Sequence, residues 1–525
     1  MGNMSSPARL RVLFFAGGPR YFLRQYSSLG KELAARGHEV HLAFRAAKGK
    51  LPEDAAGALD MPGLTYGFSP ERAQRDGWRS VAWIVRALAD LARYAHPRYE
   101  RAPELRGRMA AKTVAHLERS GEFDPLARSL GLRVARRLAD GTDEAYSERV
   151  IRTARSFEEA IPTSAVVDRF IREQAPDVVL ATPLVNRAST QVDLLKSARR
   201  LGIPSGILVA SWDNLTNKGL LKWVPERVFV WNEIQRREAV ELHGIPGDRV
   251  VATGAQLFDA WFERRPSTSR EEFAAKVGLD AGTPYVLYTC SNPAMSDTPE
   301  SSFVLAWVAA LRADERLRSL GVLIRPHPND AGEWANLDLA GHENIAVWPR
   351  DGVHTVTDDA RANFFDSLAH SAAVVGINTT AMIEAAIVGK SVLTVLAPGF
   401  AQENTLHFDY LLEEHGGFLH VAPSLEDHVG QLAHALDEDA AGAERRRRFV
   451  ESFVRPHGLE RPATPILADA IEELARLPVE SGVKPSRVLL RAPLALEAAL
   501  CGFAESRSNG RKRADARRVG APAEG

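Results

Sequence analysis

The stretch that decides the fold is RVLFFAGGPRYFLRQYSSLGKELAARGHEVHLAF, residues 11–44. Its first apolar run, VLFFA, has the length and composition of a buried strand and is followed by Gly17 and Gly18. A helical pattern extends from Tyr21 to Arg36, a glycine is placed to end it, and EVHLAF forms a second apolar run. Strand, helix and strand in this order predict a parallel βαβ unit, the start of a doubly wound sheet.

Strand-like apolar runs continue in two series along the chain, separated by helical stretches. The first series lies at residues 178–181, 207–210, 227–231 and 250–254, and the second at 285–289, 322–325, 345–348, 373–377 and 391–396. Alternation of strands and helices predicts parallel sheets. We therefore expect an α/β protein with two Rossmann-like, doubly wound parallel-sheet domains that face each other across a cleft.

The domain boundaries follow from where these series begin and end. We expect the first domain over residues 1–254, the second over residues 255–478 and a basic tail over residues 479–525. Residues 72–170 are helical in pattern and rich in arginine, which predicts a helical insert in the first domain. A helix near residues 465–474 is expected to close the second domain.

Two segments of these regions carry unusual charge. Residues 80–94 show one apolar helical face, while Arg86, Asp90 and Arg93 fall on another face that we interpret as solvated. We expect a helix packed on the domain, and the alternative is a helix at the membrane surface. The tail after residue 506 holds six Lys and Arg without apolar periodicity, and we expect it to be disordered. Docking of this tail to anionic lipid or RNA is the alternative to simple solvation.

The composition excludes several classes of protein. The 525 residues carry 66 Lys and Arg against 67 Asp and Glu, so the chain lacks the overall positive charge typical of nucleic-acid binding. Cys290 and Cys501 are too few for a disulfide framework, and no apolar run is long enough to cross a membrane. We expect a cytoplasmic protein, with association with the inner face of the cell membrane left open.

The clearest candidate ligand site is GINTTAMIEAAIVGK, residues 376–390. A strand ends here, Asn378 is suited to cap the next helix, and free amides at a helix start favour phosphate. Thr379 and Thr380 add hydroxyl groups, and Glu384 lies one turn further along the same face, where it can accept hydrogen bonds from ribose. The alternative is that Asn378 only caps the helix and Glu384 is a surface acid.

Two further polar stretches come directly after strands. In RPHP, Arg325 offers a planar guanidinium for phosphate and His327 an imidazole donor, unless this histidine is simply buried in the core. In SWDNLTNKG, Asp213 is a candidate general base and Lys218 a candidate for stabilising phosphate charge, although Asp213 could equally form a turn or cap. The other candidate substrate-binding residues are Gly17, Gly18, Arg20, Asn214 and Ser291.

The motifs that bind common cofactors are missing from the sequence. The adjacent pair Gly17 and Gly18 does not complete a G-x-G-x-x-G fingerprint, and neither a G-x-x-x-x-G-K-[ST] loop nor an H-E-x-x-H pair occurs. We therefore expect no cofactor and no metal.

The arrangement of these residues resembles two groups of enzymes. Over residues 10–475 the expected architecture resembles GT-B glycosyltransferases and the related non-hydrolysing UDP-N-acetylglucosamine 2-epimerases. VVATGAQLFDAWFE is similar to the V-x-x-T-G-N-P-x-x-D segment of those epimerases, with Ala255 and Gln256 in place of Asn and Pro. RPHP and WDNLTNK are similar to motifs of the CDP-glycerol glycerophosphotransferase family, which has a histidine where this chain has Asp213.

The resemblance implies a metal-independent glycosyltransferase of cell-envelope polysaccharide biosynthesis. It would move a sugar from a nucleotide-sugar bound in the second domain to a cell-surface glycan or lipid-linked acceptor. In this interpretation the Thr380 helix holds the diphosphate, Glu384 binds ribose, Arg325 with His327 neutralises the leaving group, and Asp213 is the base. The alternatives are a CDP-alditol phosphotransferase, a UDP-sugar 2-epimerase and a non-catalytic nucleotide-sugar-binding protein.

Overall fold

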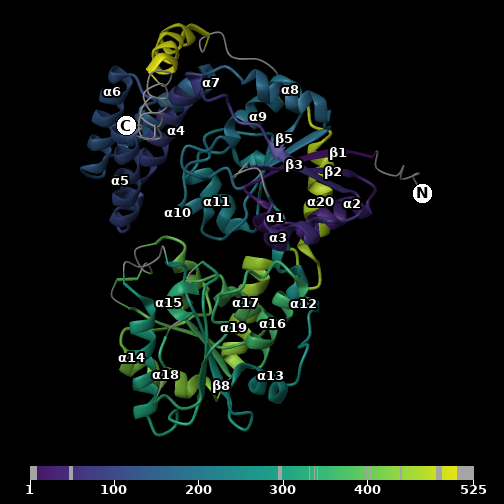
Figure 1. The fold of residues 1–525 in the computed structure, drawn as a ribbon, viewed down its shortest axis with the longest axis vertical. Coiled ribbons are helices and arrows are strands. Elements are labelled where there is room, and N and C mark those ends of the chain that lie inside the picture. The colour runs from purple at the N-terminus through teal and green to yellow at the C-terminus, as the bar shows by residue number, and fades with distance from the viewer. Residues whose placement is uncertain are drawn as a thin grey trace, which may run out of the picture.

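The structure is a computed structural model. It describes residues 9–45, 51–293, 298–329, 331–335, 337–339, 341–397, 399–400, 402, 405–437, 440–480 and 488–504. These residues form two parallel sheets with helices on their faces, and Figure 1 shows the sheets one above the other. The α/β fold with two Rossmann-like halves is therefore confirmed.

The first sheet has seven parallel strands in the order β3-β2-β1-β4-β5-β6-β7. They are β1 (Arg11–Ala16), β2 (Glu39–Arg45), β3 (Leu64–Ser69), β4 (Val178–Ala181), β5 (Ser205–Leu208), β6 (Arg227–Val230) and β7 (Val250–Ala252). The strand order reverses between β1 and β4, and ligands bind such sheets outside the carboxyl ends of the strands at this point. Gly17 and Thr182 directly follow these two strands.

The second sheet has six parallel strands in the order β10-β9-β8-β11-β12-β13. They are β8 (Tyr285–Thr289), β9 (Gly321–Arg325), β10 (Ile345–Val347), β11 (Ala373–Gly376), β12 (Val392–Val395) and β13 (His420–Ala422). Here the order reverses between β8 and β11, so that Ser291 and Asn378 lie close to the corresponding switch point. Arg325 is the last residue of the neighbouring strand β9.

Helices cover both faces of each sheet. Those of the first half are α1 (Pro19–Gln25), α2 (Ser27–Ala35), α3 (Glu53–Ala56), α9 (Gln191–Arg200), α10 (Asn214–Asn217) and α11 (Glu233–Glu241). Those that follow along the chain are α12 (Asp259–Glu263), α13 (Arg270–Val277), α14 (Glu300–Ala313), α15 (Ala331–Ala335), α16 (Asp358–Ala369), α17 (Ala381–Ile387), α18 (Leu425–Ala435), α19 (Ala440–Phe449) and α20 (Ala463–Leu474). Among the described residues, no helix has both the length and the hydropathy that crossing a bilayer requires.

The helix expected after the first strand is broken in two at Tyr26. This residue has φ −136°, and its hydroxyl bonds with Thr182 Oγ1 over 3.0 Å while its ring packs edge-on against Phe14. Phe14 also packs against Phe22, so the buried aromatic side chains fix α1 against β1. The break therefore follows from core packing, which overrides a continuous helical pattern in the sequence.

A helical insert lies between β3 and β4. It consists of α4 (Trp78–Tyr94), α5 (Pro103–Arg119), α6 (Pro125–Ala139), α7 (Glu144–Ala160) and α8 (Ala165–Gln174). In Figure 1, α4, α5 and α6 stand beside the first sheet at the upper left.

The interpretation of the polar face of α4 as solvated is wrong. Arg86, Asp90 and Arg93 are all buried. Asp90 accepts hydrogen bonds from the backbone amides of Ala188 and Leu220, over 2.8 and 2.6 Å. Arg86 pairs with the carboxylates of Glu158 and Asp193, and Arg93 donates to the carbonyl oxygens of Lys218 and Gly219. The polar face thus binds the loops that follow β4 and β5 and fixes the insert to the sheet.

The last helix, α20, does not close the second half as expected but packs on the first sheet. Its buried side chains Leu467, Ile471 and Leu474 belong to the same core cluster as Phe14 and Leu180. Figure 1 accordingly shows α20 beside α2 in the upper half. The apolar face of a helix does not specify which of two sheets it covers, so the sequence alone could not distinguish these placements.

The region expected to be a tail also contains structure. Residues 491–504 are helical and lie against the insert, where Cys501 Sγ accepts a hydrogen bond from the Asp124 amide over 3.4 Å. Gly77 allows this contact, because a Cβ there would lie 1.6 Å from the Ala498 carbonyl oxygen. The basic stretch from Arg507 onward lies outside the described residues.

One carboxylate joins the two chain crossings between the halves. Asp259 accepts hydrogen bonds from the amides of Ala463 and Thr464, over 3.0 and 2.7 Å, and forms a 3.0 Å ion pair with Arg455. Gly254 lies beside it with φ 90°, and a Cβ there would lie 2.6 Å from the Ala463 Cβ. The aspartate therefore caps α20 and holds the returning chain against the outgoing one.

Replacing Asp259 with alanine is expected to lower the free energy of unfolding by about 3–5 kcal/mol, since a buried arginine loses its only ion-pair partner among the described residues and the start of α20 loses its cap. Urea unfolding followed by tryptophan fluorescence measures this loss. Asp359→Asn, at an exposed position in the first turn of α16, is the control. An unchanged midpoint for Asp259→Ala would contradict the assigned role.

Candidate functional site

The candidate residues lie where the two halves of the chain meet. Arg361 on α16 donates a hydrogen bond to the carbonyl oxygen of Leu23 on α1 over 2.9 Å, and Gln256 donates to that of Gln25 over 3.0 Å. In Figure 1, α1 and α10 lie at the lower edge of the first half, and α15 and α17 at the upper edge of the second. The segments that follow the strands of the two sheets thus approach each other.

The turn between β11 and α17 differs in detail from the expectation. Thr380, not Asn378, occupies the N-cap position but makes no capping bond, and the amide of Ala381, the first residue of the helix, donates to Thr379 Oγ1 over 3.4 Å. Asn378 is buried, and its amide donates to Ser291 Oγ over 3.5 Å. Thr379 and Thr380 are half-buried. The amides of Met382, Ile383 and Glu384 donate to the carbonyl oxygens of Thr379 and Thr380, so this turn offers a ligand the two half-buried threonine side chains and no free helix amides, which differs from the expectation.

Glu384 and Arg325 form the buried part of the site. Burial raises the pKa of Glu384 to about 7, against the opposing charges of Arg24 and Arg325. Burial likewise lowers the pKa of Arg325 to about 10, although Glu384 opposes this shift. The Arg325 guanidinium lies over the Phe364 ring, 4.8 Å from its centroid, and donates to Ser367 Oγ over 3.2 Å. It is held in place by these neighbours without an ion pair to Glu384.

His327 is neutral at physiological pH. Burial lowers its pKa to about 4, and the charges of Arg24 and His354 act in the same direction. Its Nδ1 accepts a hydrogen bond from the Asn329 amide over 3.1 Å, which leaves the proton on Nε2. His327 can therefore donate a hydrogen bond to an anion but carries no positive charge with which to neutralise one.

Arg24 is a site residue that the sequence reasoning missed. It lies in the last turn of α1, in the first half, yet its charge acts on His327 and Glu384 in the second. It also acts on Tyr21, which in turn interacts with Asp213. Arg24 thus connects the two groups of candidate residues, and the sequence carries no local signal for a contact between such distant segments.

Asp213 is a half-buried carboxylate in the loop after β5. Burial alone would raise its pKa, but Lys218 and His407 outweigh this effect and the pKa of Asp213 is lowered. Lys218 Nζ lies 3.6 Å from Asp213 Oδ2, and the Asn214 amide group donates to Oδ1 over 3.3 Å. Its side chain makes no capping bond to α10, so this carboxylate is ionised and able to accept a proton.

His407 is a second residue that the sequence reasoning missed. It comes from the second half, packs edge-on against Trp212 at 4.5 Å between ring centroids, and lies 3.5 Å from Thr216 Oγ1. Burial lowers its pKa to about 4, with Asp213 opposing. A neutral imidazole from one half therefore fixes the loop that carries Asp213 in the other.

The remaining candidates fall into two groups. Gly17 and Arg20 are exposed and Gly18 is half-buried, all at the turn that starts α1. Asn214 and Ser291 are buried and bonded within their own halves, Asn214 to the Ala210 amide over 3.3 Å and Ser291 to Glu300 over 2.8 Å. The first three can meet a ligand, whereas Asn214 and Ser291 hold the loops in shape.

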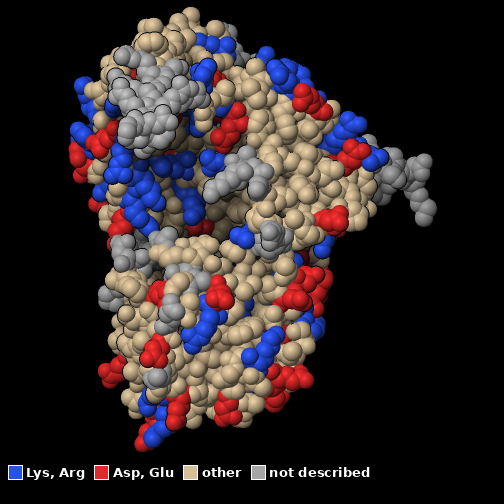
Figure 2. Space-filling model, in the orientation of Figure 1, with Lys and Arg blue, Asp and Glu red and all other residues tan. Residues whose placement is uncertain are grey.

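A recess lies beside these residues in the first half. Figure 2 shows it between the insert and the sheet, with Lys and Arg gathered along its left wall, where Figure 1 places α4 and α5. The cavity at its base has a volume of about 410 Å³ and is lined by Gly17 at one end. The glycine turn therefore borders both the recess and the helix that carries Arg24.

Solved structures show which fold this is. A putative UDP-N-acetylglucosamine 2-epimerase from Listeria monocytogenes has a TM-score of 0.50 and 12% identity, covering 91% of this chain and 100% of its own. A second UDP-N-acetylglucosamine 2-epimerase also has a TM-score of 0.50 and 12% identity, and the match covers 91% of this chain and 99% of that one. A glycosyltransferase from Rickettsia africae ESF-5 has a TM-score of 0.49 and 10% identity, and the match covers 89% of this chain and 99% of that one. No protein-family model and no curated protein matches the chain.

The likeness confirms the GT-B-like fold that the sequence resemblance implied. At 12% identity it establishes the fold alone. The similarity of RPHP and WDNLTNK to the CDP-glycerol glycerophosphotransferase family stays a prediction.

Proposed function

We propose that the protein is a GT-B-type glycosyltransferase, which moves a sugar from a nucleotide-sugar donor to a cell-surface glycan or a lipid-linked acceptor. The observation that carries the proposal is the group formed by Glu384, Arg325 and His327 in one half and Arg24 in the other. A carboxylate beside cations and a neutral donor suits a ribose linked to a diphosphate. The solved structures of this fold named for UDP-sugar substrates support the choice of donor.

The donor would bind against α17. The hydroxyls of Thr379 and Thr380 bind the diphosphate, and Arg325 and Arg24 balance its charge. Within the described part of the chain the carboxylate of Glu384 makes no hydrogen bond, so its oxygens can accept bonds from the ribose hydroxyls.

Asp213 would act as the general base. It takes the proton of the acceptor hydroxyl, the acceptor oxygen attacks the anomeric carbon, and the bond from that carbon to the diphosphate breaks. The diphosphate leaves with the electron pair, Arg325 balances its charge, and His327 donates a hydrogen bond from Nε2. A single displacement of this kind inverts the anomeric configuration and invokes no metal.

A UDP-sugar 2-epimerase is the second candidate, favoured by the names of the solved structures at a TM-score of 0.50. Such an enzyme interconverts two nucleotide-sugars and consumes no acceptor. A CDP-alditol phosphotransferase would transfer a phosphate-linked group instead. A non-catalytic nucleotide-sugar-binding protein would bind the donor without consuming it.

We also propose that the protein associates with the membrane surface through one end of the insert. Leu489, Leu496 and Leu500 in the C-terminal segment are exposed, as are Leu126 and Leu130 on α6. The two segments are in contact at Asp124, and α6 adds exposed arginines such as Arg133 and Arg136. Exposed leucines beside arginines fit an anionic lipid surface.

Binding of UDP is expected to stabilise the protein by roughly 2.7 kcal/mol at a hundred times its dissociation constant. Glu384 must lose its proton to accept ribose, so UDP affinity should fall as the pH drops below about 7. Thermal shifts and calorimetry between pH 6 and 8 measure both effects. Glu384→Gln should reduce the pH dependence to that of the terminal phosphate of UDP, which titrates at about pH 6, whereas Glu426→Gln, an exposed acid on α18, should leave it as in the native protein. A pH-independent affinity in the native protein would refute the role of Glu384.

Asp213→Asn should reduce sugar transfer by at least about a hundredfold and leave UDP binding unchanged, because the base is lost and the donor site is intact. Donor consumption with candidate acceptors is the readout, and Asp248→Asn at an exposed position is the control. Unchanged turnover would remove Asp213 from the mechanism. Conversion of a UDP-sugar without acceptor would favour the epimerase.

The full chain should co-sediment with phosphatidylglycerol vesicles but not with phosphatidylcholine vesicles, and high salt should release it. Leu496→Asp should weaken the association, because it introduces a charge into the exposed apolar face. Val240→Asp, at an exposed apolar position on α11, is the matched control. Equal binding to both vesicle types, or none, would contradict the proposal.

A further inference from the structure

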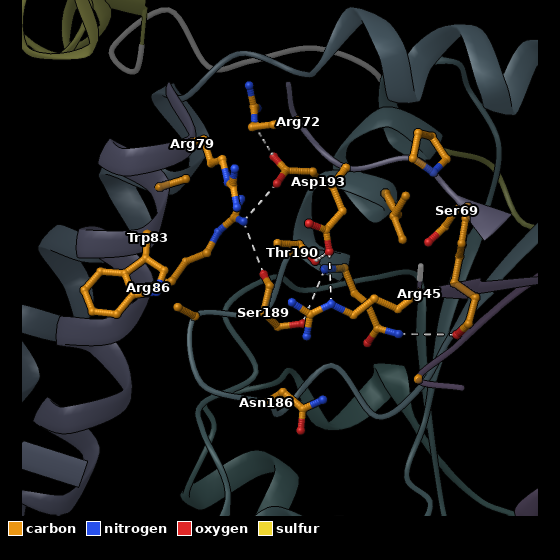
Figure 3. A pocket seen from close by; sticks show the side chains of 18 of the residues that line it. Arg45, Ser69, Arg72, Arg79, Trp83, Arg86, Asn186, Ser189, Thr190 and Asp193 are labelled. Carbon is orange, nitrogen blue, oxygen red and sulfur yellow. Dashed lines mark hydrogen bonds and ion pairs between the residues drawn. The ribbon is translucent and has the colours of Figure 1, made fainter. Parts of the chain in front are cut away.

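The recess beside the glycine turn has the size of a small-ligand site. Its cavity of about 410 Å³ is enclosed by α4, by the carboxyl ends of the first three strands and by the loop that leads into α9. Figure 3 shows side chains from all of these elements around it.

Arginine dominates the charge of this cavity. Five arginines line it against three acids, Glu71, Glu122 and Asp193. Two of the arginines are structural, because Arg72 and Arg86 are buried and pair with the two oxygens of Asp193 over 2.8 and 2.9 Å. Figure 3 shows this arrangement at the top of the cavity. The cations that can serve a ligand are the other three.

These three arginines keep donors free for a ligand. Arg45 pairs with Glu71 through Nε over 3.0 Å, and its side chain is 66% exposed. The side chain of Arg79 makes no hydrogen bond or ion pair to another described residue, although its charge helps to lower the pKa of Glu122 after the larger effect of His116. Arg187 lies over the Trp83 ring, 5.4 Å from its centroid, and donates to the Lys112 carbonyl oxygen. Figure 3 shows Arg45 reaching in from the sheet side and Arg79 from α4.

Aromatic side chains lie beside Arg187. Trp83 and His116, both lining the cavity, are stacked with ring centroids 4.1 Å apart and an interplanar angle of 29°. A hydrogen bond of 2.8 Å between His116 Nε2 and Glu122 fixes the imidazole. Flat apolar faces beside forked cations suit a ring that carries an anionic group.

We propose that this cavity binds the anionic group of an acidic sugar acceptor, a carboxylate or a phosphate, through Arg45, Arg79 and Arg187. Guanidinium groups bind both oxyanions in a forked geometry. The inference rests on the proposed glycosyltransferase function and names the class of its acceptor. Gly17 lines the cavity and begins the turn that leads to Arg24, so an acceptor bound here borders the donor side.

The test uses the full chain, saturated with UDP, and titrates glucuronate, glucose 6-phosphate and neutral glucose by calorimetry. At least one of the two anions should bind more tightly than glucose. Arg79→Gln should weaken that binding about tenfold or more without lowering the melting temperature, because Arg79 has no described partner to lose. Arg75→Gln, an exposed arginine four residues earlier that lies outside the cavity, should bind as the native protein does.

The two anions identify which oxyanion is preferred. If neither binds better than glucose, or if Arg79→Gln and Arg75→Gln bind alike, the inference is overturned. UDP titrated in parallel keeps the two proposals apart. If the protein does not bind UDP but does bind an anion through Arg79, the donor site is refuted and the anion site is supported.

Discussion

The architecture depends on the carboxylate of Asp259. It accepts the first amides of α20 and pairs with Arg455, so the segment that leaves the first half and the one that returns to it are fixed at one point. From there α20 enters the core of the first sheet. The contact of Arg361 with the Leu23 carbonyl oxygen then sets α1 against the second half. Arg24 can act on Glu384 only because these constraints hold the two halves in register.

A second constraint lies in the helical insert, whose buried charged side chains hold it against the first sheet. Asp90, Arg86 and Arg93 on α4 bond to the loops after β4 and β5 or to the acids beside them. Each of these buried charges finds partners in the same place, so that none is left uncompensated. As a result one wall of the recess is rigid, and Arg79 and Trp83 on the same helix are presented to it from a fixed position.

Much of the fold could be predicted from the pattern of apolar residues, because strands buried on both faces of a parallel sheet have continuous apolar sequences. The bounds of β4 and β8 agree with the prediction to the residue. The edge strand β3, LTYGFS, was missed because its side chains are largely exposed and it contains a glycine. Glu384 and Asp213 could be selected because they follow strands. Arg24 and His407 could not, because their significance arises from contacts between halves far apart in sequence.

The return of α20 also governs how the molecule can be divided. A fragment that ends at residue 254 lacks Leu467, Ile471 and Leu474 of the first core, so α2 and β5 would lose the helix that packs on them. The second half is thus inserted into the sequence of the first domain, and both ends of this insertion meet at Asp259. Recombination with a protein of the same fold can therefore exchange the second half only as an internal segment. The chain has to be joined at both crossings, which lie next to each other in space, and a single crossover point is not enough.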